Sequence, residues 1–373
     1  LPYLVRRLLE NGANSSFINQ YLSNEIPVSD LSFNPAAKIQ EQLDQKNLSN
    51  LPLPCEIYLP RQNSNGLDFS EPEFINSIAK HLEVLEKNRI TALAITSLEL
   101  GSTNKSDILS LCDESNIGVV HWSDPDSIHH SSFQISTEWM NASFDQRAAV
   151  LNDVANSLES QSWQFIYLLM HEAGKTIQDA HDEIREAVDF LRYYANRSTL
   201  FNSQSTQSGP TGEDNILEYC PKGLVACISP WNFPLAITLG QIAAALVTGN
   251  TVIAKASEET SLIAFKAAGL FFNHGLPKDA LHPLLGDGRV GQAIITSQAL
   301  DLVVFTGSLK TAKSIHNSLS NKPGKIVPLI AETGGLNSMV VDSSALIERA
   351  CDDIMRSAFN SAGQRCSALR LLL

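Results

Sequence analysis

An α/β fold around a doubly wound parallel sheet is the fold class that the sequence predicts from Gly223 onward. Short apolar runs alternate there with spans of helical periodicity, and polar residues follow the apolar runs directly. Parallel strands need a helix to cover each crossover, so every run and its following helix form one unit. The expected strands are 224–228, 251–255, 281–285, 302–305 and 326–330, and the expected helices are 235–247, 260–273, 288–298 and 308–319.

Upstream of this region, residues 144–199 predict two long amphipathic helices. Ala148, Leu151 and Leu158 recur at helical spacing in the first, as do Ile184 and Leu191 in the second. The run 172–176 between them, with its glycine, predicts a turn that ends the first helix. Residues 71–135 mix helical segments with short apolar runs and indicate no function.

Composition excludes several functional classes. The 373 residues are 43% hydrophobic and can bury the cores of two or more domains. A net charge of −13 argues against nucleic-acid binding, which needs clustered Lys and Arg. The six cysteines form no Cys-x-x-Cys pair, so neither a metal site nor a disulfide framework is expected, and a reducing cytoplasm fits best. No apolar run approaches the roughly 20 residues of a transmembrane helix.

Polar residues collect where the predicted strands end. Ser229 to Asn232 follow the first strand, Lys255 ends the second, Thr306 to Ser308 follow the fourth, and Glu332 to Gly335 follow the fifth. The carboxyl ends of parallel strands lie at one edge of a sheet, where such folds bind ligands. We therefore expect one site built from these segments.

Cys366 stands between Arg365 and Ser367, a polar context that suits a nucleophilic thiol. Such a thiol must be accessible and react as the thiolate, whereas a buried structural role is the alternative for a free cysteine. Cys220, Cys227 and Cys351 lie in or beside apolar patterns, and for these three we expect the buried structural role.

Four motifs in order carry a family resemblance. Pro-Trp-Asn-Phe-Pro at 230–234, Phe-Thr-Gly-Ser at 305–308, Glu-Thr-Gly-Gly at 332–335 and Gly-Gln-Arg-Cys at 363–366 resemble the NAD(P)-dependent aldehyde dehydrogenase superfamily. The resemblance covers roughly residues 130–373 and is closest to glutamate-semialdehyde (1-pyrroline-5-carboxylate) dehydrogenases. Residues 3–14 resemble the last barrel segment of a flavin-dependent proline dehydrogenase, as in bifunctional PutA-type proteins.

The resemblance implies four segments. Residues 1–23 would be the C-terminal remnant of a proline dehydrogenase barrel, and 24–95 a linker and connecting segment rich in Pro, Asn and Ser. Residues 96–335 would form a Rossmann-like NAD-binding domain, and 336–373 the truncated start of a second α/β catalytic domain. We expect a piece of a longer protein, weak or inactive by itself, whose parent is a cytoplasmic homo-oligomer, with peripheral association at the inner membrane as an alternative.

The implied activity is NAD-dependent oxidation of L-glutamate 5-semialdehyde to L-glutamate in proline catabolism. Cys366 would add to the aldehyde, giving a thiohemiacetal and then a thioester. Asn232 and the Cys366 backbone N–H would stabilise the oxyanion, and Glu332 would be the general base. A turn-forming Asn and a capping Glu are the structural alternatives. Another aldehyde dehydrogenase, such as one for succinate semialdehyde, and a non-catalytic fragment of this fold also stay open.

The cofactor and substrate sites follow from the same resemblance. A Gly-x-Gly-x-x-Gly match at 286–291 is weak, and the resemblance favours Gly307 and Ser308 for the pyrophosphate. An acidic Glu258 at the ribose favours NAD over NADP, and a solvated loop is the alternative for the Lys255–Glu258 segment. The implied cofactor-binding residues are Ser229, Trp231, Lys255, Glu258, Gly307, Ser308, Thr333 and Gly334.

Phe233 and Ser367 would bind the aldehyde substrate. Arg6 and Arg7, with Tyr3 and Glu10, would be the remnant of a proline site, whose alternative is an exposed helix face. FAD would bind only in the proline dehydrogenase domain, outside this chain.

Overall fold

The computed structural model describes residues 5, 9, 34–44, 52–67, 69, 78, 80, 81, 89–201 and 205–373. The chain divides into two compact units, Leu1–Leu53 and Pro54–Leu373. The described part of the first unit contains helix α4 (Pro35–Asp44). All features that follow belong to the second unit.

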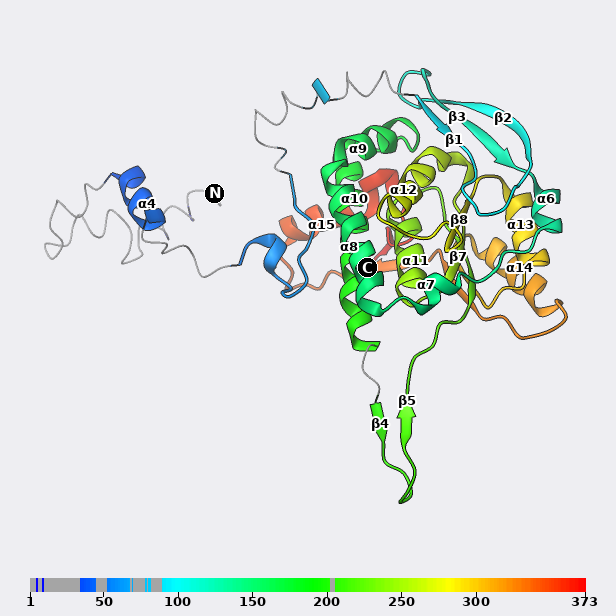
Figure 1. The fold of residues 1–373 in the computed structure, drawn as a ribbon. Coiled ribbons are helices and arrows are strands. Elements are labelled where there is room, and N and C mark those ends of the chain that lie inside the picture. Colours follow the sequence, from blue (N-terminus) through cyan, green and yellow to red (C-terminus); the bar gives the residue numbers. More distant parts are fainter. Residues whose placement is uncertain are drawn as a thin grey trace, which may run out of the picture. The chain divides into compact units, whose positions relative to one another are not determined.

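A five-stranded parallel sheet forms the centre of the second unit (Figure 1). Its strands lie in the order β10-β9-β6-β7-β8. The chain runs outward from β6 through β7 to β8 and then returns to place β9 on the other side of β6. This reversal between β6 and β9 is the switch point at which doubly wound folds bind ligands. The strands are β6 (Leu224–Ile228), β7 (Thr251–Lys255), β8 (Leu281–Leu284), β9 (Leu302–Gly307) and β10 (Leu329–Thr333).

Helices cover both faces of this sheet. Val225 and Cys227 of β6 pack into one apolar core, whereas Leu224 and Ala226 pack into a second, as strand alternation requires. The first core joins the sheet to α8 (Phe144–Ser160), α9 (Ser162–His171), α10 (Ile177–Ser198), α11 (Ala236–Val247) and α12 (Ser261–Asn273). The second joins it to α6 (Pro125–His130), α13 (Gly288–Ser297) and α14 (Leu309–Ser320).

Three smaller sheets surround this centre. The first, in the order β1-β3-β2, contains β1 (Ile90–Ala92), β2 (Ser102–Leu109) and β3 (Asn116–Ser123). The hairpin of β4 (Ser205–Gln207) and β5 (Asn215–Leu217) projects from the unit (Figure 1). The third pairs β11 (Asn337–Met339) with β12 (Leu369–Leu372) in parallel, with α15 (Ile347–Phe359) between them in the chain. The short helices are α7 (Thr137–Asn141), η1 (Pro54–Glu56), η2 (Thr199–Phe201), η3 (Glu258–Thr260) and η4 (Asn360–Gly363).

Two buried glutamates bind the start of crossover helices α11 and α12. Neither helix has a side-chain cap of its own. Glu183 of α10 accepts the backbone N–H groups of Leu235 and Ala236, and Glu172 after α9 accepts those of Leu262 and Ile263. The side-chain oxygens satisfy N–H groups that have no partner within the helix, so these contacts tie α11 to α10 and α12 to the turn after α9.

Most predicted elements are confirmed, and two expectations are wrong. Strands 224–228 and 251–255 form with the expected bounds. The fifth strand begins at Leu329 rather than at residue 326 because Pro328 has no N–H to donate, although its carbonyl accepts from Val303. Residues 144–199 form three helices instead of two, since α8 ends at Ser160 and α9 starts at Ser162.

Part of the predicted linker is bound to α8 and α10. The Ser64 backbone N–H and hydroxyl both donate to Asp189, and the Asn65 N–H donates to Glu159. Arg192 bridges Glu159 and the carbonyl of Asn63. Residues 63–65 are therefore fixed on the second unit. The domain boundaries at 23, 95 and 335 stay predictions.

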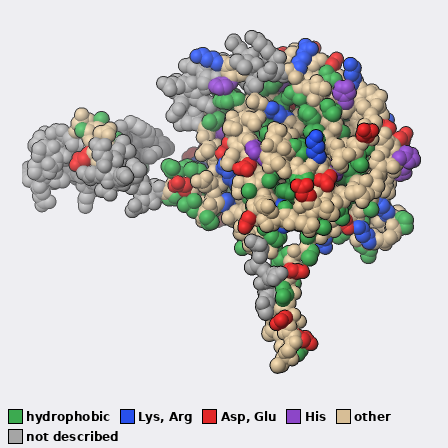
Figure 2. Space-filling model, viewed as in Figure 1, with side chains coloured by type: hydrophobic (Ala, Val, Ile, Leu, Met, Phe, Trp, Pro, Cys, Tyr) green, Lys and Arg blue, Asp and Glu red, His purple; other side chains and the backbone are tan. Residues whose placement is uncertain are grey.

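Among the described residues, no helix combines the length and apolarity that crossing a membrane requires. In the space-filling view, the projecting hairpin carries acidic and hydrophobic side chains at its surface (Figure 2). Ile216 and Leu217 of β5 are both more than half exposed.

Candidate active site

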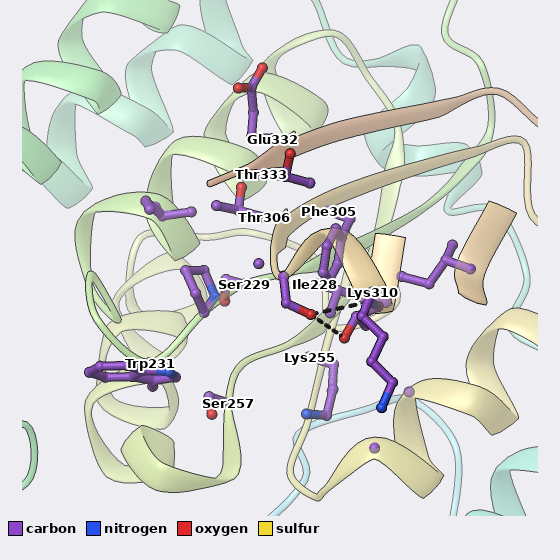
Figure 3. Close-up of a pocket in the computed structure, with 18 of the residues that line it drawn as sticks. Ile228, Ser229, Trp231, Lys255, Ser257, Phe305, Thr306, Lys310, Glu332 and Thr333 are labelled. Carbon is purple, nitrogen blue, oxygen red and sulfur yellow. Dashed lines mark hydrogen bonds between the residues drawn. The ribbon is translucent and has the colours of Figure 1, made fainter. Parts of the chain in front are cut away.

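A cleft of about 770 Å³ opens at the carboxyl ends of β6, β7, β9 and β10, across the switch point of the sheet. In the view of Figure 3, Glu332 and Thr333 lie at one end of the cleft, and Lys255 and Ser257 lie at the other. All eight residues expected to bind the cofactor line this cleft, together with the three expected catalytic residues. These eleven residues therefore line one connected cleft, and their roles there stay predictions.

Lys255 and Glu258 form the polar end of the cleft. The Lys255 side chain is 7% exposed, and its Nζ lies 3.4 Å from Glu258 Oε2. Burial lowers the pKa of Lys255, and the carboxylate of Glu258 opposes this shift. Trp231, about half exposed, lines the cleft as well. This end offers hydrogen-bond donors and acceptors beside an indole face.

Gly307 and Phe305 form the floor of the cleft, and the missing side chain of Gly307 lets a ligand approach the backbone closely. A Cβ at this position would lie 2.6 Å from Cζ of Phe305, whose ring is buried. Ser308, the next residue, caps α14 by accepting the Thr311 N–H. The backbone at 307–308 therefore leads straight into a helix N-terminus, which suits an anionic group.

Several cleft residues were missed by sequence reasoning. The cleft extends between α13 and α14 and is lined by Gly288, Gly291, Gln292, Lys310, Thr311 and Ser314. The glycines belong to the Gly-x-Gly-x-x-Gly match at 286–291, so this segment contributes to the same cleft as Gly307 and Ser308. A signal for the α14 residues was their helical spacing after the Phe-Thr-Gly-Ser motif.

Cys366 is exposed and lies on a loop that begins in strained backbone. Ser361, Ala362 and Gly363 all have φ between 53° and 68°, in the left-handed region. Arg370 donates to the carbonyl of Gly363 at 2.8 Å. We call residues 360–368 the nucleophile loop.

Two asparagines bind the nucleophile loop through its carbonyl groups. Asn232 Nδ2 donates to the carbonyl oxygen of Gln364 at 2.8 Å. Asn337 Nδ2 donates to the carbonyls of Cys366 at 2.6 Å and of Ala368 at 3.0 Å. Sequence reasoning found Asn232 and missed Asn337, which follows the Glu-Thr-Gly-Gly motif by two positions.

Cys366 lies where three cavities meet. Besides the cleft, it lines a cavity of about 230 Å³, which also contains Phe233 and Ser367, the two residues expected to bind substrate. We call this the acidic cavity, because its other charged residues are Asp179, Asp182, Glu183, Glu186, Lys175 and Arg365. A third, apolar cavity of about 640 Å³ is lined by Cys366 and Glu332 and by aromatic residues of α8 and α10.

Glu332 lies in β10 rather than after it, and its side chain is exposed. It lines both the cleft and the apolar cavity, as Cys366 does. Thr333 and Gly334 continue along the cleft wall. Glu332 and the thiol of Cys366 therefore share the lining of two cavities.

A buried ion pair forms part of the wall of the acidic cavity. Lys175 Nζ is 2.9 Å from Glu183 Oε2, with side chains 5% and 0% exposed. Burial raises the pKa of Glu183, and Lys175 opposes this shift. Burial and Glu183 also raise the pKa of Glu186, which faces the same cavity. Sequence reasoning missed all three residues.

The other cysteines differ from expectation at two positions. Cys227 is buried as expected, and burial raises the pKa of its thiol to about 12. Cys220 and Cys351 are exposed, so the prediction that they are buried is wrong. Cys220 precedes a proline before β6, and Cys351 lies on α15, whose described residues include none that is buried. Tyr3, Arg6, Arg7 and Glu10 lie outside the described residues.

Comparisons with known proteins agree with these motifs. A model of the aldehyde dehydrogenase family matches residues 96–373. The chain is 39% identical over 388 residues to the bifunctional protein PutA of Escherichia coli strain K12, covering all of this chain and 28% of that protein. It therefore spans less than a third of that relative's length.

Solved structures give the same picture. A mutant of proline utilization A from Bradyrhizobium japonicum superposes with a TM-score of 0.77 at 42% identity, covering all of this chain and 35% of that one. A Thermus 1-pyrroline-5-carboxylate dehydrogenase with bound NAD superposes with a TM-score of 0.77 at 26% identity, covering 85% of this chain and 63% of that one. By its motifs and by the match over residues 96–373, the chain belongs to the aldehyde dehydrogenase family.

Proposed function

We propose that this chain carries the NAD-dependent L-glutamate 5-semialdehyde dehydrogenase function of a PutA-type bifunctional protein. The observation that carries the proposal is the position of Cys366, an exposed thiol shared by the cleft and the acidic cavity. A thiol at such a junction can meet an aldehyde from one side and a dinucleotide from the other.

The cleft residues fit a dinucleotide. Gly307 lets the backbone approach closely, because no side chain larger than hydrogen fits over Phe305. Lys255 and Glu258 suit the two ribose hydroxyls, and the acid disfavours a 2′-phosphate. Bound NAD would supply the hydride acceptor beside Cys366. The Thermus relative whose structure was solved with NAD supports this choice.

The protein residues then account for the covalent steps. The Cys366 thiolate adds to the aldehyde carbon, and the carbonyl oxygen takes the negative charge. Asn232 Nδ2 donates to the Gln364 carbonyl in the nucleophile loop, which supports a role for its second amide N–H as a donor to the developing oxyanion. Loss of hydride leaves a thioester on Cys366. Glu332, exposed on the same side, accepts a proton from water as the water attacks, releasing glutamate and the thiolate.

The acidic cavity favours an amino-acid semialdehyde. Its lining places four carboxylates against two cations, and one cation, Lys175, is already paired with Glu183. Such a wall attracts the α-ammonium group of glutamate semialdehyde, which succinate semialdehyde lacks. Phe233 offers an apolar contact for the aliphatic part, and Ser367 a hydroxyl for the carboxylate.

The proposal also covers the remaining parts of the protein. Residues 1–23 would end a proline dehydrogenase domain that binds FAD, 96–335 would bind NAD, and 336–373 would begin the catalytic domain. The six free thiols fit a reducing cytoplasm. The exposed Ile216 and Leu217 of the hairpin support a homo-oligomer.

The test is NADH formation by the intact protein with L-glutamate 5-semialdehyde and with succinate semialdehyde. Cys366→Ser should lower turnover by a factor on the order of a thousand or more, because the covalent route is lost. Cys351→Ser, at another exposed thiol, is the matched control and should leave turnover unchanged. Preference for succinate semialdehyde would contradict the substrate assignment. Undiminished turnover in Cys366→Ser would overturn the function.

A further inference from the structure

The ion pair of Lys175 and Glu183 forms part of the wall of the acidic cavity. Both partners are almost fully buried, with Nζ and Oε2 2.9 Å apart. They come from the turn after α9 and from α10, whereas the site loop 232–235 precedes α11. The pair therefore connects two separate helices to the loop that carries Asn232.

Glu183 binds one end of this loop. Its Oε1 accepts the backbone N–H of Leu235 at 2.8 Å and that of Ala236 at 3.2 Å, at the otherwise uncapped start of α11. Its Oε2 is engaged by Lys175. Both carboxylate oxygens are thus used, and the position of Leu235 is fixed three residues beyond Asn232.

Lys175 binds the middle of the loop. Its Nζ lies 4.3 Å from the centroid of the Phe233 ring, within cation–π range. Glu183 fixes the position of the Lys175 ammonium group, so the cation that contacts the Phe233 ring has a defined place. Asn232, the next residue along, reaches the nucleophile loop through Gln364. One ion pair therefore sets the position of a substrate-lining ring and of an amide beside the thiol.

A contribution to the stability of the fold does not by itself explain why this ion pair is buried. Taking two charges out of water costs about as much as their attraction returns, and apolar replacements of similar volume are often equally stable. A cation directly beneath the Phe233 ring instead suggests a geometric role at the site.

We propose that Lys175 and Glu183 are positioning residues that set the aldehyde affinity of the acidic cavity by holding Phe233 and Asn232. This inference rests on the proposed function. We assign the ion pair no role in NAD binding, because neither Lys175 nor Glu183 is among the described residues that line the cleft.

The experiment compares two paired variants of the intact protein. Lys175→Met with Glu183→Gln removes both charges, keeps an acceptor for the Leu235 N–H and retains similar volumes. The matched control is Arg192→Met with Glu159→Gln, which removes the partly buried α10–α8 ion pair at 2.6 Å; neither residue is among the described lining of the acidic cavity. Steady-state KM for L-glutamate 5-semialdehyde and for NAD, kcat and thermal unfolding are measured for each.

Lys175→Met with Glu183→Gln should raise the KM for the aldehyde about tenfold, because the desolvated contact between Lys175 and the Phe233 ring is lost and the loop 232–235 is no longer fixed. Its NAD KM should stay unchanged, and the control should lose thermal stability without altering either KM. An unchanged aldehyde KM would overturn the proposal, and so would failure of the first variant to fold. If the wild-type protein did not oxidise L-glutamate 5-semialdehyde, the proposed function would be refuted. That result differs from an unchanged KM in the variant, which would refute only the positioning role.

Discussion

At the residue scale, Cys366 is placed by its neighbours. Asn337 holds the carbonyls on either side of Ser367, and Arg370 holds Gly363 where the backbone is left-handed. Strained backbone persists only when surrounding contacts determine it, and here those contacts are side-chain donors to loop carbonyls. The reactivity of the thiol therefore depends on residues that do not touch substrate.

Asn337→Ala should weaken catalysis without removing the thiol. Two hydrogen bonds to the nucleophile loop are lost, each worth about 1 kcal/mol, so kcat/KM should fall by a factor of about 30. Steady-state kinetics of the intact protein provide the measurement. Ser338→Ala, at the next and exposed residue of β11, is the control. Equal kcat/KM in the two variants would show that Asn337 does not position Cys366.

Gly307→Ala should impair cofactor binding specifically. The added Cβ would meet the buried Phe305 ring at 2.6 Å, and overpacking of this kind costs about 1 to 3 kcal/mol. We expect the Kd for NAD to rise about tenfold, measured by quenching of tryptophan fluorescence, to which Trp231 in the cleft contributes. Gly269→Ala, where an added Cβ meets nothing within 4 Å, should bind NAD normally. A normal Kd for Gly307→Ala would refute this account of the cleft floor.

At this scale the sequence predicted the residues within motifs and missed those between them. Cys366, Asn232 and Glu332 lie in short runs whose composition suits their chemistry. Glu183 and Leu235 are 52 positions apart, and Asn337 and Cys366 are 29 apart. Neither pair follows a local period, so only the folded chain brings its members together.

At the element scale, the sheet positions the site through the caps of its crossover helices. Strands β6 and β7 were predicted with their observed bounds because each is a continuous apolar run bounded by polar residues. The caps could not be predicted, because Glu172 and Glu183 accept from backbone N–H groups that lie 90 and 52 residues later in the chain. The sequence around the start of α11 or α12 does not indicate which distant side chain caps the helix.

Glu172 should make the stability of the fold depend on pH. Burial raises its pKa from 4.5 to about 8, although two backbone N–H groups oppose the shift. The folded chain thus binds this proton more tightly than the unfolded chain does. The proton's contribution to stability is fully present below pH 4.5 and is lost as pH rises through about 8.

Glu172→Gln tests this dependence. Glutamine does not titrate, so the variant should lose less unfolding free energy across that window than the wild type loses. Thermal unfolding at a series of pH values compares the two proteins directly. Parallel pH profiles would mean that Glu172 keeps the same protonation state throughout.

At the scale of the whole molecule, the fold brings a dinucleotide-sized cleft and an acidic cavity together at one thiol. The cleft follows from the strand order β10-β9-β6-β7-β8. The alternation of apolar runs and helical spans predicted a doubly wound parallel sheet, but not this order. The acidic cavity does not follow from that alternation. It forms where α10, the loop before α11 and the nucleophile loop meet, three segments that are far apart in the sequence.

The account as a whole depends on a covalent bond between Cys366 and the substrate. The most direct measurement is peptide mass spectrometry of the intact Glu332→Gln protein, quenched in acid after mixing with L-glutamate 5-semialdehyde and NAD. Slowed hydrolysis should let one glutamyl group accumulate as a thioester on the peptide containing Cys366, and only when both NAD and aldehyde are present. Turnover without that adduct, or with the adduct on another cysteine, would contradict the account.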